Sequence, residues 1–274
     1  MPRRRVRATR PLLLAAALAV GGCSGAGDAL EISGSTTVNP IVVEVAEAYR
    51  RQGNDVLIDT QGGSSGGLAQ LRDGQIDIAM SSKPLDGADP DTFRGTVVAY
   101  DAVGVAVHPA VVAGGVDGVN RVQLAAIFEG TITNWAELGG PDVAIFVYDK
   151  EPGRGTREVF DEFLYGAGEP RRRATHRNYA VAGANEESRL KISTTTGAIG
   201  PLSIAFIDDS LATLDVEGVA PTVGTIRDGS YGIVRPLLLV TDGEPSAPAQ
   251  EFIDLTMSAT GTEVITALGY LPPG

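Results

Sequence analysis

Short apolar segments with strand periodicity alternate with helix-like segments along this chain, and the alternation limits the folds it can adopt. Strands are expected at 29–32, 55–59, 76–80, 96–107 (as one or two strands), 143–147, 202–207 and 237–240. Helices are expected at 40–52, 68–72, 122–128, 155–165, 249–257 and 263–268. Strands and helices in alternation, joined by short polar turns, are typical of an α/β fold with mostly parallel sheets.

Three polar, glycine-containing turns each lie between an expected strand and an expected helix. They span residues 33–40, 61–67 and 151–157. A helix start carries backbone N–H groups without intrahelical partners and a partial positive charge, and glycine lets an anion approach those groups closely. Ordinary N-capping by serine and threonine explains any one of these turns equally well. The three turns together predict a shared oxyanion pocket.

Residues 1–22 have the features of a secretory signal peptide. A stretch with five arginines ends at Arg10, and the apolar run that follows it is too short to span a bilayer as a helix. Small residues then precede Cys23, as in the lipobox of bacterial lipoproteins, which this segment resembles. The resemblance implies cleavage before Cys23, a lipid on its sulfur and a flexible tether over 23–28. The alternative is an ordinary signal peptide with an incidental cysteine.

Charge and cysteine content exclude several classes of function. The whole chain has a net charge of −12. Five of its 22 basic residues and none of its 34 acidic residues lie in the signal peptide, so the mature chain carries −17. Nucleic-acid binding, which needs a basic surface, is therefore not expected. One cysteine excludes an internal disulfide and a cysteine-based zinc cluster, and we expect neither a metal nor a cofactor.

One of the three turns also has the spacing of a hydrolase nucleophile. Residues 62–66 read G-x-S-x-G, with Ser64 in the position of the nucleophile after a strand and before a helix. Such an enzyme needs a histidine base, and the chain offers His108 and His176, neither of them beside a histidine-glycine oxyanion motif. A serine hydrolase that uses Ser64 is therefore the alternative to a binding protein.

Seven stretches resemble conserved blocks of the phosphate-binding lipoproteins of bacterial phosphate ABC transporters, in the order in which that family has them. They are residues 34–41, 63–67, 77–85, 127–135, 153–157, 197–200 and 269–272. The resemblance implies an α/β, two-lobed type II periplasmic-binding-protein fold with a hinge and a central ligand cleft. Lobe 1 is then expected at 29–104 and again at 234–274, and lobe 2 at 105–233.

The resemblance also implies a set of ligand-binding residues. Matched position by position, they are Thr36, Thr37, Ser64, Ser82, Lys150, Arg154, Gly155 and Thr156. Two of them depart from the family pattern. Lys150 stands where the family usually has arginine, which replaces a bidentate donor with a point charge. Arg154 stands where the family has a serine that donates to phosphate. Ser82 falls where some members carry aspartate, so an acceptor for a protonated oxyanion is missing there.

These implications add up to an expected function. The chain is expected to be a monomeric, lipid-anchored solute-binding protein on the extracytoplasmic face of the cell membrane, not an enzyme. Its expected partners are inorganic phosphate or a related oxyanion, the permease subunits of an ABC transporter, and the membrane through Cys23. The alternatives are the serine hydrolase using Ser64, and a binding-fold protein that serves as an anion sensor or adhesin.

Overall fold

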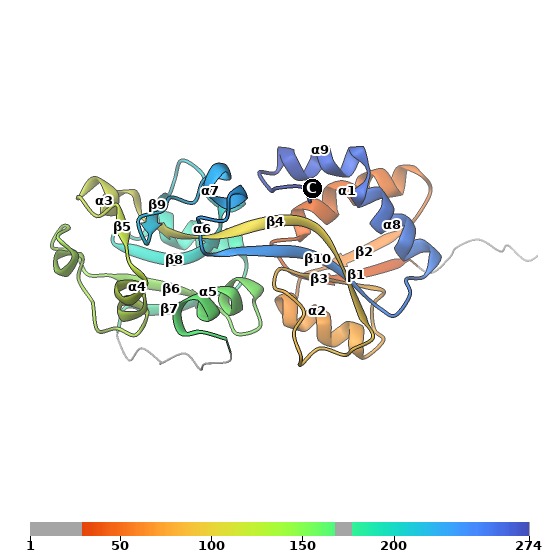
Figure 1. Cartoon of the computed structure of the whole chain (residues 1–274), viewed down its shortest axis with the longest axis horizontal. Helices are drawn as coiled ribbons and strands as arrows, with labels where there is room; N and C mark the ends of the chain where they lie inside the picture. The colour runs from red at the N-terminus through yellow and green to blue at the C-terminus, as the bar shows by residue number, and fades with distance from the viewer. Residues whose placement is uncertain (1–28, 168–176, 274) are drawn as a thin grey trace, which may run out of the picture.

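The computed structural model describes residues 29–167 and 177–273, which form two α/β halves joined by two long strands (Figure 1). The strands are β1 (Leu30–Gly34), β2 (Val56–Asp59), β3 (Ile78–Ser81), β4 (Phe93–Val107), β5 (Gly118–Val119), β6 (Phe146–Lys150), β7 (Tyr179–Ala182), β8 (Ala198–Ser203), β9 (Ala212–Val216) and β10 (Val234–Asp242). The α-helices are α1 (Asn39–Arg51), α2 (Gly63–Arg72), α3 (Pro109–Ala113), α4 (Arg121–Phe128), α5 (Gly155–Tyr165), α6 (Asn185–Thr194), α7 (Val223–Arg227), α8 (Ala247–Met257) and α9 (Ala259–Ala267). The expected signal peptide 1–22, Cys23 and the tether 23–28 lie outside the described residues.

The sheet is parallel inside each half and antiparallel where the halves are joined. The strand order in the described chain is β2-β1-β3-β10-β4-β8-β6-β7, with β9 beside β4 and β5 beside β9. In the first half β1 pairs in parallel with β2 and β3, and in the second β6 pairs in parallel with β7 and β8. β10 pairs antiparallel with β3 and β4, and β4 antiparallel with β8. The α/β class is thus confirmed, whereas the expectation of mostly parallel sheets is wrong at the centre of the molecule.

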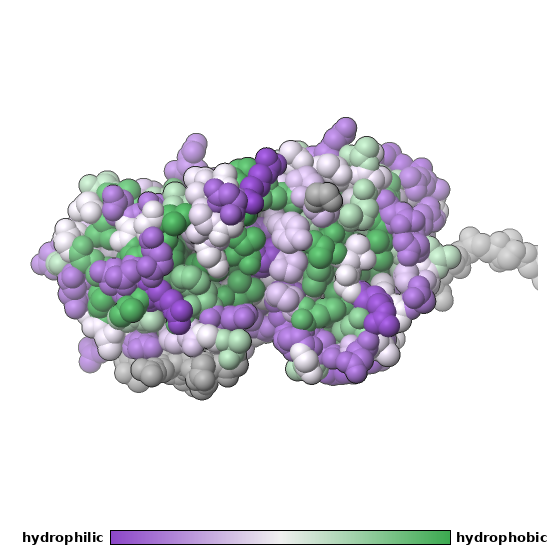
Figure 2. Space-filling view, in the orientation of Figure 1, coloured by the Kyte–Doolittle hydropathy of each residue, from purple (hydrophilic) through white to green (hydrophobic). Residues whose placement is uncertain are grey.

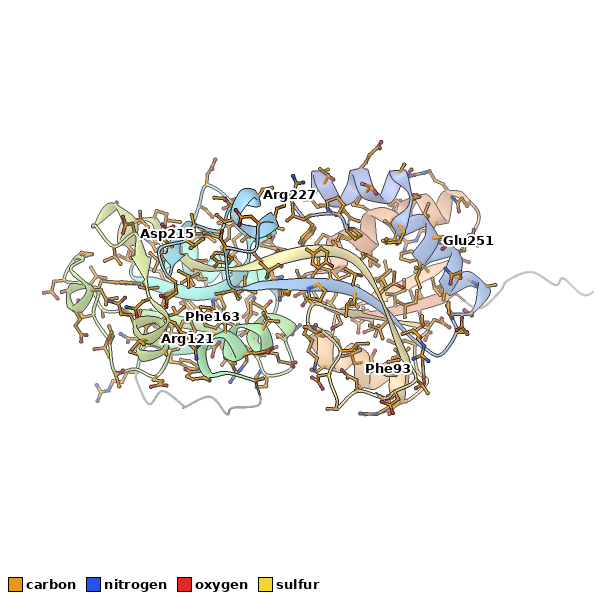
Figure 3. The ribbon with its side chains drawn as sticks, viewed as in Figure 1. Phe93, Arg121, Phe163, Asp215, Arg227 and Glu251 are labelled. Carbon is orange, nitrogen blue, oxygen red and sulfur yellow. The ribbon has the colours of Figure 1, made fainter. Side chains whose placement is uncertain are left out.

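β4 and β10 connect the two halves. β4 begins at Phe93 beside α2 in the first half and ends at Val107 in the second, and β10 runs back in the opposite direction (Figures 1 and 3). The sequence left open whether residues 96–107 form one strand or two, and the structure has one continuous strand. The halves meet along most of their height, with a notch between them at the lower edge of the view in Figure 2.

Each half has its own apolar core. In the first half α1 contributes a buried stripe that includes Ile41, Val45 and Tyr49, and it packs with α8 and α9 on one face of the sheet. Leu68 and Leu71 of α2 pack on the opposite face. In the second half, α4 and α5 cover one face of the sheet and α6 the other. Because each sheet is covered on both faces, the polar ends of its strands and helices are left to form the site.

Several element boundaries differ from the sequence prediction, and β5, β7, β9, α3, α6 and α7 were not predicted. α2 was expected over 68–72 but begins at Gly63, within the glycine-rich turn. The strand expected at 202–207 is instead β8 (Ala198–Ser203), and residues Ile204–Phe206 form a 3₁₀ turn. The starts of α2 and β8 were missed because glycines and small residues were interpreted as loop where tertiary packing holds them in a helix or a strand.

Gly34 fixes the first turn of the site. Its φ of +134° lies in a region that side chains rarely adopt. A Cβ built on Gly34 would lie 2.3 Å from the carbonyl oxygen of Met80 in the neighbouring strand β3. Glycine is therefore required for the chain to leave β1 and enter α1 at this place.

Candidate functional site

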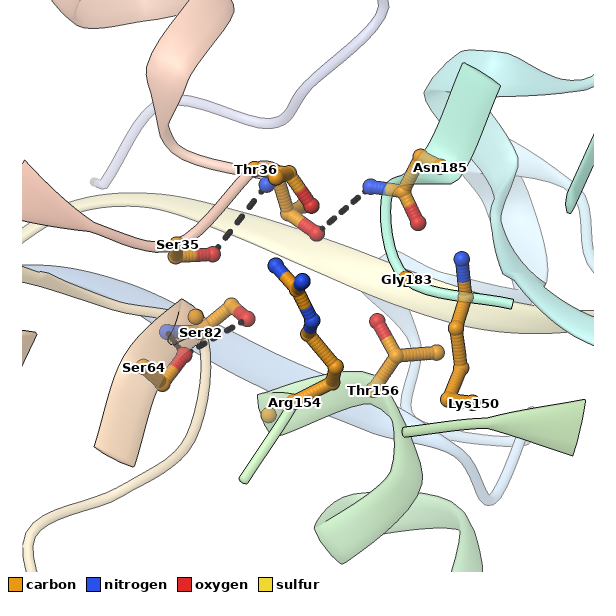
Figure 4. Close-up of a pocket in the computed structure, with 12 residues that line it drawn as sticks. Ser35, Thr36, Ser64, Ser82, Lys150, Arg154, Thr156, Gly183 and Asn185 are labelled. Atoms are coloured by element: carbon orange, nitrogen blue, oxygen red, sulfur yellow. Dashed lines mark hydrogen bonds between the residues drawn. The ribbon is translucent and has the colours of Figure 1, made fainter. Parts of the chain in front are cut away.

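Four helix N-termini converge on one small pocket between the two halves. α1 and α2 come from the first half, and α5 and α6 from the second. The residues that line the pocket are Ser35, Thr36, Thr37, Gly63, Ser64, Ser82, Lys150, Arg154, Gly155, Thr156, Gly183 and Asn185 (Figure 4). Within the described chain, no protein group accepts a hydrogen bond from the backbone N–H of Ser64, Gly155 or Thr156. The helix starts therefore offer free donors and a positive potential to an anion.

The pocket is narrow because the two halves touch around it. The space inside the pocket that the centre of a water molecule can reach is about 10 Å³, which is room for about one water molecule. A Cβ on Gly155 would lie 2.7 Å from Ser64 Oγ and 2.6 Å from Ser82 Oγ, so glycine is needed for α5 to approach the first half. Ser65 of the first half donates its backbone N–H to Gly153 O of the second at 3.1 Å. The site thus suits a ligand of only a few non-hydrogen atoms.

Lys150 places a buried ammonium group at the pocket. Its side chain extends from the end of β6, and Nζ donates to Ser188 Oγ at 2.5 Å and to Ala184 O at 3.1 Å. Burial, and after it the nearby charges of Arg235 and Arg154, lower the pKa of Lys150 to about 7. A bound anion would oppose both effects. The ammonium group is therefore a cation that is more stable with an anion beside it.

Arg154 lines the pocket as the N-cap residue of α5. Its Nε and Nη2 donate to Glu151 Oε2 at 3.1 and 2.7 Å, and Nη1 lies 3.4 Å from Thr60 O in the other half. An arginine in place of the family's serine can either fill the pocket or supply a charged donor to the ligand. The guanidinium lies at the pocket, but Glu151 already neutralises part of its charge.

Arg235 of β10 lies directly behind the lining residues and is fully buried. Its Nε and Nη2 donate to Asp101 Oδ2 on β4 at 3.0 and 2.8 Å. Nη1 donates to Thr156 Oγ1 in the second half at 2.8 Å, and Nη2 to Thr37 Oγ1 in the first at 3.2 Å. One guanidinium from a linking strand thereby holds a hydroxyl group from each half.

The structure brings all eight predicted site residues to this pocket. Ser35 and Gly63 also line the pocket and belong to the predicted turns, although they were not among the predicted ligands. Gly183 and Asn185 in the lining, and Arg235 behind it, were not predicted. Arg235 had a signal, since it is the one charged residue in the apolar run 233–240. Asn185 begins a helix whose first turn contains two glutamates, and acidic residues there argue against an anion site, so no local signal marked it.

The hydrolase alternative finds no support in the geometry. His108 is the N-cap of α3 and accepts a hydrogen bond from the Ala110 N–H, and it does not line the pocket. His176 lies outside the described residues. Ser64 Oγ accepts from the Ser82 N–H at 3.1 Å and shares a hydrogen bond with Ser82 Oγ.

Over residues 29–167 and 177–273, no group of three or more His, Cys, Asp or Glu side chains is arranged to hold a metal ion.

Comparison with known proteins identifies the family. A model of the PBP superfamily domain matches residues 22–260. The phosphate-binding protein PstS of Bacillus subtilis is 32% identical over 253 residues, which cover 90% of this chain and 81% of the relative. The chain belongs to the PstS-type phosphate-binding proteins of the PBP superfamily. PstS of Borreliella burgdorferi, another relative, is 31% identical over an alignment that covers 88% of this chain and 89% of the relative.

Solved structures agree with the family assignment. A phosphate ABC transporter substrate-binding protein of Clostridium perfringens with bound phosphate has a TM-score of 0.82 at 29% identity, with 90% of this chain and 100% of that chain covered. A phosphate transport receptor of Vibrio cholerae has a TM-score of 0.74 at 30% identity, and the match covers 89% of this chain and 100% of the receptor chain. The expected two-lobed type II periplasmic-binding-protein fold is confirmed. No helix in the described part of this family member has the length and apolar character needed to cross a membrane.

Proposed function

We propose that this protein captures inorganic phosphate between its two halves and delivers it to the permease of an ABC transporter. The observation that carries the proposal is the convergence of four helix starts, serine and threonine hydroxyls and the Lys150 and Arg154 side chains on one small pocket, with the Arg235 guanidinium directly behind it. Lys150, Arg154 and Arg235 supply positive charge at the site, part of which Glu151 and Asp101 neutralise, although the chain as a whole is acidic. No enzymatic activity is assigned to the site.

The binding step uses oriented donors rather than a general positive field. Surface charges of the protein are screened within about 8–10 Å at ordinary ionic strength, whereas donors inside a closed pocket are not. Hydrogen bonds to a charged oxygen are about twice as strong as neutral ones. Closure of the two halves excludes water and strengthens each of these bonds. Phosphate is therefore held against a net charge that repels it at long range.

The delivery step needs a location near the permease. We assign residues 1–22 to a lipoprotein signal peptide, Cys23 to lipid attachment and 23–28 to a tether, and we place the protein as a monomer on the extracytoplasmic face of the membrane. Lobe 1 is assigned to 29–104 and 234–274, and lobe 2 to 105–233. With the lipid on Cys23, the tether keeps the closed, loaded protein within reach of the membrane.

Calorimetric titration of the chain without its first 22 residues tests the proposal. Phosphate is expected to bind with a Kd below about 10 μM, a binding free energy stronger than about −7 kcal/mol. Sulfate, phosphite and molybdate are titrated in parallel. Weaker phosphate binding would contradict a role in phosphate uptake. A chromogenic ester that is turned over, and no longer turned over after Ser64→Ala, would favour a hydrolase.

Arg154→Ala is expected to weaken phosphate binding about tenfold or less. The effect is modest because Glu151 Oε2 already accepts from two nitrogens of the guanidinium and neutralises part of its charge. Glu151→Gln is the matched control, since it leaves the arginine without its partner and is expected to strengthen binding slightly. Titration of both variants with the same four anions measures this. If Arg154→Ala binds every anion as the unmodified protein does, the guanidinium does not act on the ligand.

A further inference from the structure

Asn185 is a buried residue whose side-chain oxygen has no hydrogen-bond partner. The residue is 1% exposed and lies at the first position of α6, where it lines the pocket. Its Nδ2 donates to Thr37 Oγ1 at 2.9 Å across the two halves. Within the described residues nothing donates to its Oδ1. In Figure 4 the amide projects toward the space between Thr156 and Lys150. A buried acceptor without a donor is costly, so its position at a ligand pocket calls for a donor on the ligand.

The hydroxyl groups around Asn185 are oriented as donors to the ligand. A threonine hydroxyl has one hydrogen and two lone pairs. Thr37 Oγ1 accepts from both Asn185 Nδ2 and Arg235 Nη2, so both lone pairs are used and its hydrogen is free. Thr156 Oγ1 accepts from Arg235 Nη1, which likewise leaves its hydrogen for another acceptor. Arginine can only donate, and so it fixes the direction of both hydroxyl bonds.

The groups that line the pocket therefore differ in whether they need an acceptor or a donor on the ligand. Free backbone N–H groups, the hydroxyl hydrogens and the Lys150 ammonium all require acceptor oxygens. The Asn185 oxygen requires a hydrogen. Ser82 has no carboxylate that could accept a hydrogen bond from the ligand in its place. We propose that Asn185 Oδ1 is the acceptor that recognises the proton of a singly protonated oxyanion, such as hydrogen phosphate, and disfavours dianions that carry no proton.

This inference rests on the proposed function and adds a basis for specificity to it. A site that hydrogen-bonds a ligand hydroxyl discriminates strongly against an analogue without it, because the buried group of the site is then left unpaired. Monofluorophosphate is the sharpest probe, since it is a dianion in which fluorine replaces the hydroxyl of hydrogen phosphate. Sulfate is a second dianion that carries no proton near neutral pH.

The first experiment uses the unmodified mature protein at a pH at which phosphate is mainly hydrogen phosphate. Phosphate is expected to bind at least about 100-fold more tightly than monofluorophosphate or sulfate. If phosphate itself does not bind, the proposed function fails. If phosphate and monofluorophosphate bind within about threefold of each other, the role of Asn185 is wrong and the proposed function stands.

Two substitutions at the same position then isolate the oxygen. Asn185→Leu and Asn185→Asp both remove the donor to Thr37, but only Asp keeps an acceptor. Asn185→Leu is expected to lower the preference for phosphate over monofluorophosphate at least about tenfold. Asn185→Asp is expected to keep this preference, even though its negative charge weakens the binding of all anions. An equal loss of preference in both variants would assign the effect to the Thr37 bond and overturn the inference. Thermal unfolding of each variant shows whether it is folded, and the measurement on the unmodified protein needs no variant.

Discussion

Arg235→Met is expected to weaken phosphate binding at least about 100-fold, the largest effect of any single substitution at the site. Arg235 donates to hydroxyl groups of Thr37 and Thr156, which come from opposite halves of the molecule. Its loss removes a buried positive charge and also the restraint that directs both hydroxyl hydrogens toward the ligand. Methionine fills much of the same volume without donating. Calorimetric titration with phosphate measures the effect.

The same substitution is expected to destabilise the protein. It leaves the Asp101 carboxylate buried without its cation, which typically costs about 3–5 kcal/mol in the free energy of unfolding. The double variant Arg235→Met with Asp101→Asn removes the charge and keeps an acceptor for the Ser203 hydroxyl. We expect it to recover most of the stability in urea unfolding but none of the affinity. Recovery of affinity in the double variant would show that Arg235 only neutralises Asp101.

Local sequence patterns predict the elements that bury one apolar face. α5 begins and ends at the predicted residues, and α1 is within one residue at each end, because its buried residues follow the helical period. The linking strands are different. β10 pairs with β3 and with β4, from which it is separated by more than 125 residues. Such long-range antiparallel pairing leaves no trace in local periodicity, so the direction of the central strands was not predictable.

The parts of the site that depend on local sequence were predictable, and the parts that depend on long-range contacts were not. Each of the three turns carries its own signal, since glycine and hydroxyl residues stand together before a helix, and the family resemblance added Lys150 and Ser82. Arg235 and Asn185 act through partners that are 134 and 148 residues away in the sequence. Their roles depend on which hydroxyl lone pairs are already in use, and that information exists only in the folded protein.

Phosphate affinity is expected to fall with rising pH through the titration of Lys150. The pKa of this ammonium is lowered to about 7, first by burial and then by Arg235 and Arg154. Above that pH the free protein has a neutral lysine that must take up a proton when the anion binds. Each pH unit above about 7 then weakens binding by up to about tenfold, until the pH passes the raised pKa of the complex. Titrations between about pH 8 and pH 10 measure this, because phosphate itself stays a dianion over that range.

Two variants separate the lysine from other titrating groups. Lys150→Arg stays charged over the whole range, so its affinity is expected to be independent of pH, whatever its level. Lys150→Met is expected to bind weakly at every pH. Folding stability of the free protein is expected to change in the opposite direction to affinity. The unfolded lysine, with its ordinary pKa near 10.5, holds a proton that the folded lysine has lost, so stability rises with pH between about 7 and about 10.5. An affinity in the unmodified protein that does not change with pH would show that the Lys150 charge does not act on the ligand.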